Sequence, residues 1–155
     1  MQIHASCAAR DGAGVLLLGP PGSGKSDLLL RLLDQGFVLV SDDRVNIDGD
    51  IATPPEALAG LLEVWGLGIF RLPHAPSARL ALTVDLGRPT ERLPAPAWHP
   101  TLALPLVTVD PWLPSAPQRV SLALDCALGR IMQIAGAFAP HPAGQQASSS
   151  GAVVP

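Results

Sequence analysis

The chain has 155 residues, which suits one domain with a single buried core and excludes a second large domain. A hydrophobic fraction of 48% and a mean hydropathy of +0.33 indicate a folded, core-rich protein, and the charged fraction of 15% is low for a fully free surface. The net charge of −3 provides no basic surface, which argues against nucleic acid as a partner.

The first part of the chain predicts two strands that lead into a glycine-rich loop. Residues 3–8 and the apolar run at 15–18 flank the sequence RDGAG, which is typical of a short turn between strands. His4 and the charged turn interrupt any apolar leader, so we expect no signal peptide and a cytoplasmic protein. Cys7 and Cys126 fit no metal-binding spacing, which predicts two buried reduced thiols.

The glycine-rich loop carries the most specific local pattern. It reads GPPGSGKS and fits GxxxxGK[ST], between the apolar run and a leucine-periodic stretch, which is the strand, loop and helix setting that binds nucleotide phosphates. The glycines allow backbone N–H groups to turn inward, and the helix start adds its positive dipole end. The predicted nucleotide-binding residues are Gly19, Pro20, Pro21, Gly22, Ser23, Gly24, Lys25 and Ser26. Lys25 would neutralise the β- and γ-phosphates and Ser26 would hold Mg²⁺; the alternative is a chance glycine turn before a helix.

A pair of acids follows the next predicted strand. The helix after Lys25 is expected to end near Gln35, and the buried strand at 37–40 then leads into Asp42 and Asp43. In an open α/β sheet these carboxylates are expected to face the crevice at the strand ends, where one could bind Mg²⁺ through water and the other could act as a base. The alternative is a pair of turn-forming aspartates.

The middle of the chain is predicted to alternate short strands and loops. Residues 45–51 suggest a hairpin around an Asp-Gly turn, and residues 56–62 suggest a short helix. Strands are expected at 80–86 and 102–109, joined by the proline-rich loop at 88–100.

A long helix is predicted near the C-terminus. The sequence SAPQ has the spacing of a capping box, and apolar residues then recur at helical intervals over residues 120–139. Asp125 and Arg130 within this stretch argue against a membrane span. We therefore expect a single domain over residues 1–139 and a disordered tail over residues 140–155, which has little to bury.

Acids so close to the loop point to small kinases. Shikimate- and gluconate-type kinases also need an arginine-bearing lid, for which the sequence shows no paired arginines. Another family matches more of the chain. Taken together, His4, the loop sequence GPPGSGKS, VSDDRVNI at residues 40–47 and LLEVWGLGIF at residues 61–70 resemble the catalytic C-terminal domain of HPr kinase/phosphorylase, over roughly residues 1–110.

The resemblance implies a fold and a set of site residues. The fold would be an α/β P-loop-containing, phosphoenolpyruvate-carboxykinase-like mixed sheet with flanking helices. Asp43 would take the proton from the substrate serine, and would return one when the reaction runs backward with inorganic phosphate. The implied catalytic residues are His4, Lys25, Asp43 and Arg92, and the implied metal ligands are Ser26, Asp42 and Glu63. Without the resemblance, His4 would be a structural histidine, Glu63 a solvated helix-end acid and Arg92 a surface charge.

Some features depart from the family pattern. Trp65 stands where the family signature has an arginine, and the sequence has no counterpart of the family's N-terminal domain. The basic loop that engages the protein substrate also has no clear counterpart in residues 105–119. In that stretch, Trp112 is either an exposed anchor for a partner or part of a core lid.

The predicted function is an ATP- and Mg²⁺-dependent protein serine kinase that acts on the phosphocarrier HPr or a relative, with phosphorolysis of the product. The resemblance and the low charged fraction suggest a homo-oligomer, most simply a hexamer, with no nucleic-acid or membrane partner. Two alternatives stay open. One is a small-molecule kinase, and the other is a nucleotide-binding regulatory module without catalysis, which Trp65 and the missing substrate loop motivate.

Overall fold

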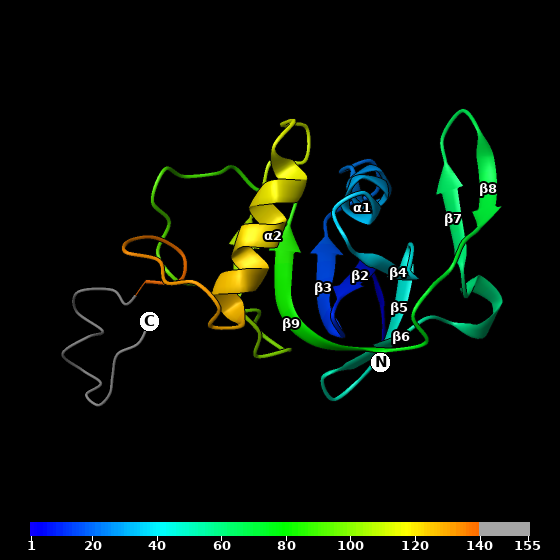
Figure 1. Ribbon diagram of the computed structural model, residues 1–155, viewed down its shortest axis with the longest axis horizontal. Helices are drawn as coiled ribbons and strands as arrows, with labels where there is room; N and C mark the ends of the chain where they lie inside the picture. Colours follow the sequence, from blue (N-terminus) through cyan, green and yellow to red (C-terminus); the bar gives the residue numbers. More distant parts are fainter. Residues whose placement is uncertain (140–155) are drawn as a thin grey trace.

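A computed structural model describes residues 1–139 of the protein (Figure 1), so the tail predicted for residues 140–155 lies outside the described residues. The fold is a mixed eight-stranded sheet with two helices and a separate two-stranded hairpin. In chain order the elements are β1 (Gln2–His4), β2 (Ser6–Arg10), β3 (Ala13–Leu18), α1 (Lys25–Leu33), β4 (Val38–Ser41), β5 (Arg44–Asp48), β6 (Ile51–Thr53), β7 (Leu61–Val64), β8 (Gly68–Arg71), β9 (Ala78–Asp85), β10 (Leu106–Thr108) and α2 (Ala116–Ala127).

Strand directions bring several strand ends to one edge of the sheet. The order is β1-β5-β6-β9-β3-β2-β4, and β10 pairs with β9. Strand β9 is parallel to both β3 and β10, while β2 is antiparallel to both β3 and β4. Strands β3, β4, β9 and β10 therefore run in the same direction, and their carboxyl ends meet at one edge. The glycine-rich loop and the acid pair leave the sheet there.

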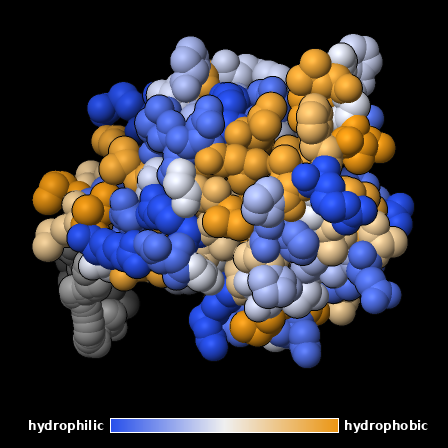
Figure 2. Space-filling view, turned by 45° about the vertical axis from the view of Figure 1, so that its right-hand side comes forward, coloured by the Kyte–Doolittle hydropathy of each residue, from blue (hydrophilic) through white to orange (hydrophobic). Residues whose placement is uncertain are grey.

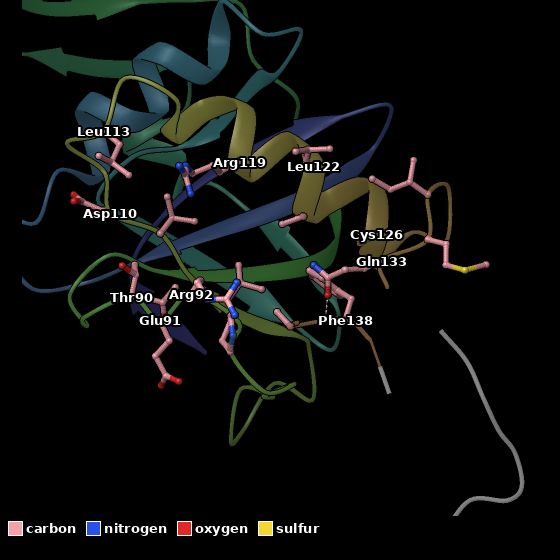
Figure 3. Close-up of a pocket in the computed structure, with 18 residues that line it drawn as sticks. Thr90, Glu91, Arg92, Asp110, Leu113, Arg119, Leu122, Cys126, Gln133 and Phe138 are labelled. Carbon is pink, nitrogen blue, oxygen red and sulfur yellow. Dashed lines mark hydrogen bonds between the residues drawn. The ribbon is translucent and has the colours of Figure 1, made fainter. Parts of the chain in front are cut away.

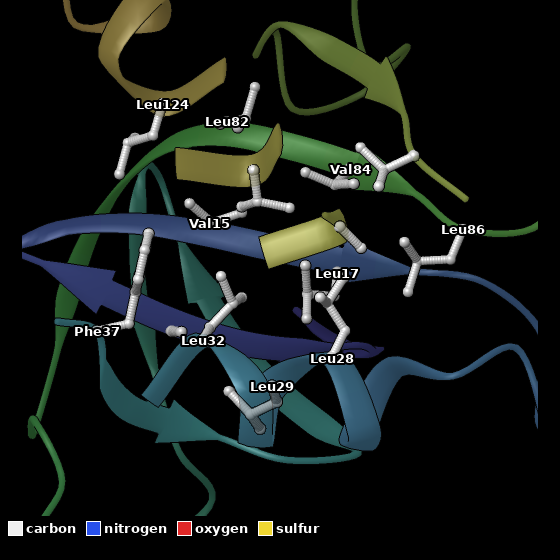
Figure 4. Close-up of a cluster of buried hydrophobic side chains, with 14 of the residues drawn as sticks. Val15, Leu17, Leu28, Leu29, Leu32, Phe37, Leu82, Val84, Leu86 and Leu124 are labelled. Atoms are coloured by element: carbon white, nitrogen blue, oxygen red, sulfur yellow. The ribbon is translucent and has the colours of Figure 1, made fainter. Parts of the chain in front are cut away.

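Both helices cover the same face of the sheet. The leucines of α1 and the apolar side of α2 pack with one set of strand residues, as Figure 4 shows for Leu28, Leu32 and Leu124 around Val15 and Leu17. The alternating residues of the same strands point to a second cluster on the opposite face. The central strands are thus buried on both faces, which holds the loop between β3 and α1 on a rigid base.

The two cysteines differ in their surroundings. Cys7 lies in the second cluster, and burial raises the pKa of its thiol to about 12 because a thiolate there has no water to solvate it. Cys126 on α2 is only partly buried, and burial together with the nearby Asp125 carboxylate raises the pKa of its thiol. The expectation of two buried thiols is therefore right for Cys7 and wrong for Cys126.

The helix predicted for residues 56–62 is wrong. Only Glu56–Leu58 form one 3-10 turn, and Gly60 then takes a φ of 77°, which a right-handed helix does not allow. The signature sequence that follows forms the antiparallel hairpin of β7 and β8, so Glu63 lies on a strand rather than at a helix end.

The C-terminal helix is shorter than its sequence pattern predicts. Helix α2 ends at Ala127, and Gly129 takes a φ of 74°, which terminates the helix in the left-handed conformation. The predicted capping box is also wrong, because the Ser115 side chain makes no cap and instead accepts a hydrogen bond from Arg119 Nε at 2.8 Å. Within residues 1–139, no helix is both long and apolar enough to cross a bilayer.

The segment predicted as one strand at residues 3–8 forms the two strands β1 and β2, which pair with different strands. The remaining strand predictions hold with shifted ends. The hairpin around the Asp-Gly turn is confirmed as β5 and β6, and the strand predicted at 80–86 is β9. The strand predicted at 102–109 is reduced to the three residues of β10, because the proline-containing stretch before it pairs only through an isolated bridge between Trp98 and Pro105.

Candidate functional site

Asp42 joins three segments at the carboxyl edge of the sheet. Its Oδ1 atom accepts a hydrogen bond from Ser26 Oγ at 2.8 Å and another from Ser6 Oγ at 2.7 Å. Ser26 lies in the first turn of α1, Ser6 begins β2, and Asp42 follows β4. The carboxylate predicted to hold a metal is therefore already next to the hydroxyl predicted to share that metal.

Ser6 is a residue that the sequence analysis did not single out. It is fully buried, and its Oγ also accepts a hydrogen bond from the backbone N–H of Asp43 at 3.3 Å. The sequence carries one signal for this residue. Ser6 places a hydroxyl in a mostly apolar strand, two residues after His4.

Asp43 has an unusual backbone and a free side chain. Its φ is 73°, in the left-handed region that is uncommon for residues other than glycine, although aspartate tolerates it better than most. The Asp43 carbonyl accepts a hydrogen bond from Ala5 N–H at 3.2 Å, so both of its backbone polar groups are tied to the start of β2. The carboxylate is 69% exposed and lies 3.9 Å from the Arg44 guanidinium. Strain held in place in this way is typical of functional positions.

The glycine-rich loop has the features of an anion cradle. Gly19, Gly22 and Gly24 all have positive φ, and a Cβ at position 19 would lie 2.4 Å from Ser23 Oγ, so that position requires glycine. Lys25 Nζ reaches back over the loop and donates hydrogen bonds to the carbonyls of Gly19 at 2.6 Å and Pro20 at 3.1 Å.

One polar atom of the loop has no partner. In the described part of the chain, the buried hydroxyl of Ser23 makes no hydrogen bond. A buried hydroxyl, a lysine amine and turned backbone N–H groups are donors that fit the oxygens of a phosphate chain. These residues therefore fit a bound nucleotide.

A segment after β10 lies along the loop. A Cβ on Gly24 would be 3.2 Å from both Pro111 and the ring of Trp112, and Arg31 of α1 donates to the carbonyls of Pro111 and Leu113. Trp112 remains 66% exposed. It is thus an exposed side chain whose ring edge touches the loop, and it is not a core lid.

Glu63 reaches the same region from the hairpin. It lines a cavity of about 210 Å³ between α1 and β7, together with Ser26, Asp27 and Trp65. Across residues 1–139, however, no group of three His, Cys, Asp or Glu side chains forms a ready-made metal site. This agrees with the chemistry of Mg²⁺, which takes one or two carboxylates and completes its shell with water and phosphate oxygens.

His4 and Arg92 occupy different positions relative to this centre. His4 ends β1, is exposed, and pairs across the strands with Arg44, the residue after Asp43. Arg92 follows β9 and lines a separate cavity beside α2, to which no residue of the glycine-rich loop contributes. The structure therefore joins Ser26 to Asp42 by a hydrogen bond and places Glu63 in one cavity with Ser26. Asp43 is the exposed neighbour of Asp42, His4 lies on the strand that pairs with β5, and Arg92 lies in a different cavity.

Comparison with known proteins finds a family similar to the first part of the chain. Residues 1–75 match the family described as HPr Serine kinase C-terminal domain, a stretch that contains the glycine-rich loop, the acid pair and Glu63. This part of the chain is thus similar to the HPr kinase C-terminal domain family. The matched stretch ends before Arg92, so the family match does not extend to that residue.

Curated relatives in the family carry the name HPr kinase/phosphorylase. The protein from Geobacillus thermodenitrificans is 39% identical over 87 residues, which cover 48% of this chain and 28% of the relative. The protein from Xylella fastidiosa is 48% identical over 66 residues (39% of this chain, 21% of the relative), and that from Clostridium perfringens is 48% identical over 72 residues (44% and 24%). The matched part of the chain thus spans about a quarter of the length of these relatives.

The fold is similar to a solved structure of the HPr kinase family. The structure of the Hpr(Ser) kinase/phosphatase from Coxiella burnetii matches with a TM-score of 0.68 and 22% identity, and the match covers 83% of this chain and 92% of that chain. The likeness covers more of the chain than residues 1–75, and it supports the expected mixed α/β fold.

Proposed function

We propose that this protein is an ATP-dependent protein serine kinase that phosphorylates HPr or a related phosphocarrier, and that it also catalyses phosphorolysis of the phosphoserine. The observation that carries the proposal is the hydrogen bond between Asp42 and Ser26, with Asp43 next in the chain and free to accept a proton. This hydrogen bond supports a metal held by Ser26 and Asp42 beside the lysine-bearing loop, with the adjacent Asp43 as the base.

The loop residues would bind the nucleotide. The backbone N–H groups of residues 19–26 would surround the phosphates, Ser23 would donate its unpartnered hydroxyl, and Lys25 would exchange its contacts with loop carbonyls for phosphate oxygens. Bound ATP supplies the phosphoryl group, and bound Mg²⁺ neutralises its charge. Ser26 and Asp42 would hold the metal, with Glu63 on the side of the hairpin.

Asp43 would act on the substrate hydroxyl. As the serine oxygen forms its bond to the γ-phosphorus and the bond to ADP breaks, the Asp43 carboxylate would take up the hydroxyl proton. In the reverse direction the same carboxyl group would return a proton to the serine oxygen as inorganic phosphate attacks. His4, one strand away, would assist at this centre. For Arg92, stabilisation of the transferring charge stays a prediction, since it lies in a different cavity.

The proposal includes a cytoplasmic location and a homo-oligomer, with a hexamer as the expected size. The homo-oligomer is supported by the apolar residues exposed on the β7–β8 hairpin, which include Trp65, Leu67 and Ile69.

A transfer assay tests the proposed function. The purified protein is incubated with Mg²⁺, ATP labelled at the γ-phosphate and purified HPr, and the label is then located by mass spectrometry. We expect label on a serine of HPr with the wild type and none with Asp43→Asn. In parallel reactions, shikimate or a sugar acid replaces HPr. Label on one of these compounds, and none on HPr, would support the small-molecule kinase.

A nucleotide-binding module without catalysis is the second candidate. It is favoured by Trp65, which is 94% exposed where the family has an arginine, and by the position of Arg92 in a cavity that no residue of the loop lines. This candidate predicts that nucleotide binds to the wild type while no label reaches HPr, so one titration beside the transfer assay distinguishes the two.

A further inference from the structure

A second cavity lies beside α2, apart from the candidate kinase site. It has a volume of about 660 Å³ and is bounded by α2, β10, the loop after β9 and the segment that follows α2 (Figure 3). Sites for small organic ligands typically enclose about 300–1,000 Å³. No residue of the glycine-rich loop or the acid pair lines it, and the stretch at 110–113 separates it from that loop.

One part of the cavity wall is apolar and open to water. Its lining includes Val109, Leu113, Leu122, Met132 and Phe138, from the stretch between β10 and α2, from α2 itself and from the segment beyond α2. Leu122 is 58% exposed and Met132 is 75% exposed. Apolar side chains that surround a hollow gain free energy when a ligand removes them from water.

The other part of the wall carries two arginines without acidic partners. Within residues 1–139, none of the ion pairs involves Arg92 or Arg119. Arg119 uses its Nε to bond Ser115 Oγ at 2.8 Å, which leaves the two terminal nitrogens of its guanidinium for another acceptor. Planar guanidinium groups bind carboxylates through paired hydrogen bonds.

The acidic residues of the lining do not neutralise these arginines. Asp110 Oδ1 accepts the backbone N–H of Trp112 at 3.0 Å, so one of its oxygens is engaged at the edge of the cavity. In Figure 3 the carboxylates of Glu91 and Asp110 point away from the middle of the cavity, while Arg92 and Arg119 lie nearer to it. Arg92 and Arg119 are therefore the charged groups nearest to the middle of the cavity.

We propose that this cavity is a binding site for a small organic acid with an apolar body. The ligand's carboxylate would meet Arg92 and Arg119, and its apolar body would lie against the α2 side of the wall, near Leu122. Such a ligand is neither the nucleotide nor the phosphocarrier of the proposed function, and the site does not depend on the kinase activity.

A comparison of two probes tests the site. The ¹⁵N-labelled full chain is titrated with octanoate and, separately, with 1-octanol, which has the same chain length and no charge, and amide chemical shifts are followed by NMR. Hydrogen bonds to a charged group contribute about 1.5–3 kcal/mol, so octanoate should bind about tenfold or more tightly than octanol. The shifts should centre on residues 107–126 and 131–138.

Variants of the two arginines test whether their guanidinium groups cause the preference for octanoate over octanol. Arg119→Gln, alone and combined with Arg92→Gln, should remove the preference for octanoate, while octanol binding stays within about twofold because the apolar wall is intact. Arg79→Gln is the matched control, since Arg79 is an exposed arginine that pairs with Asp50 and does not line the cavity. Dispersed amide spectra verify that each variant is folded.

Three results would overturn the proposal. They are equal binding of octanol and octanoate to the wild type, retention of the preference in the double variant, and shifts that centre on the β7–β8 hairpin. The wild-type comparison decides the matter even if the double variant does not fold.

Discussion

The Asp42 carboxylate connects residues that are far apart in the sequence. It accepts hydroxyl hydrogen bonds from Ser6, 36 residues away, and from Ser26, 16 residues away. Each donor fixes one lone-pair direction of the same oxygen, so the second carboxylate oxygen remains available to a metal. Asp42 and Asp43 are neighbours in the chain, yet the first is tied into the fold and the second is exposed.

The acid pair should therefore respond differently to the same substitution. Asp43→Asn should lower the transfer rate by about 10²–10⁴-fold with nucleotide affinity and folding unchanged, because asparagine also tolerates the left-handed backbone. Asp42→Asn should instead raise the Mg²⁺ concentration needed for half-maximal rate. Transfer assays across a Mg²⁺ series, with nucleotide titrations, measure both effects. Equal Mg²⁺ dependence in the two variants would contradict these separate roles.

Lys25 provides a second test, because it is the single lysine of the chain. An amine-reactive ester can label only Lys25 and the Met1 amine, and the latter bonds the Ile47 carbonyl and serves as an internal reference. Mg²⁺-ATP should protect Lys25 and leave Met1 labelling unchanged, as read by mass spectrometry. Lys25→Ala should raise the nucleotide dissociation constant by about 10–100-fold through the lost charged hydrogen bonds. Unprotected Lys25 would contradict the phosphate contact.

The extent of α1 can be predicted from its sequence better than the extent of α2. The strand, loop and helix at the start of the chain follow from local rules: apolar runs, glycines and leucines at helical spacing. The apolar residues beyond Gly129 keep a helical spacing but form no helix. Gly129 adopts the left-handed conformation, which a glycine takes at little cost in free energy, and helix α2 ends before it. Exposed Ile134 shows that these side chains bury little in the described fold.

Helix α2 should contribute to stability mainly through its buried side. Leu124 is fully buried in the cluster with α1 and the sheet, whereas Leu122 is 58% exposed. Leu124→Ala should lower the free energy of unfolding by about 2–5 kcal/mol, and Leu122→Ala should change it by less than about 0.5 kcal/mol. Urea unfolding followed by circular dichroism measures both. Similar midpoints would mean that α2 does not pack on the sheet as described.

The β7–β8 hairpin is a separate two-stranded sheet that lies to one side of the main sheet (Figure 1). Trp65, Leu67 and Ile69 are each more than two-thirds exposed on it. Figure 2 turns this side of the molecule forward and shows apolar side chains gathered across its upper part. A two-stranded ribbon is marginally stable by itself, so contact with another subunit would stabilise it.

The proposed homo-oligomer gives the corresponding prediction. The double variant Trp65→Ser, Ile69→Ser should lower the molar mass in solution to that of the monomer and keep the fold. Leu93→Ser is the matched control, because Leu93 is a 53% exposed leucine in the loop after β9. Sedimentation velocity at tens of micromolar decides this. A monomeric wild type, or an oligomer that survives the double variant, would contradict the hairpin as an interface.

The sequence by itself determined the features that depend on neighbours in the chain. Glycine torsions, apolar periodicity and the order of motifs depend on a few consecutive residues, so the glycine-rich loop, α1, the acid pair at a strand end and the family resemblance were all accessible. The strand order and the two-sided burial of the central strands were not, since they depend on pairings across the whole chain.

Only the tertiary structure decided which side chains meet. It tied Asp42 to Ser6 and Ser26, left Asp43 exposed, laid Trp112 against Gly24 and placed Arg92 in the cavity beside α2. Each of these results depends on how β2, β4 and β10 lie in the sheet relative to α1 and α2. Side-chain contacts over such separations are set by packing of the core, which no local pattern of residues encodes.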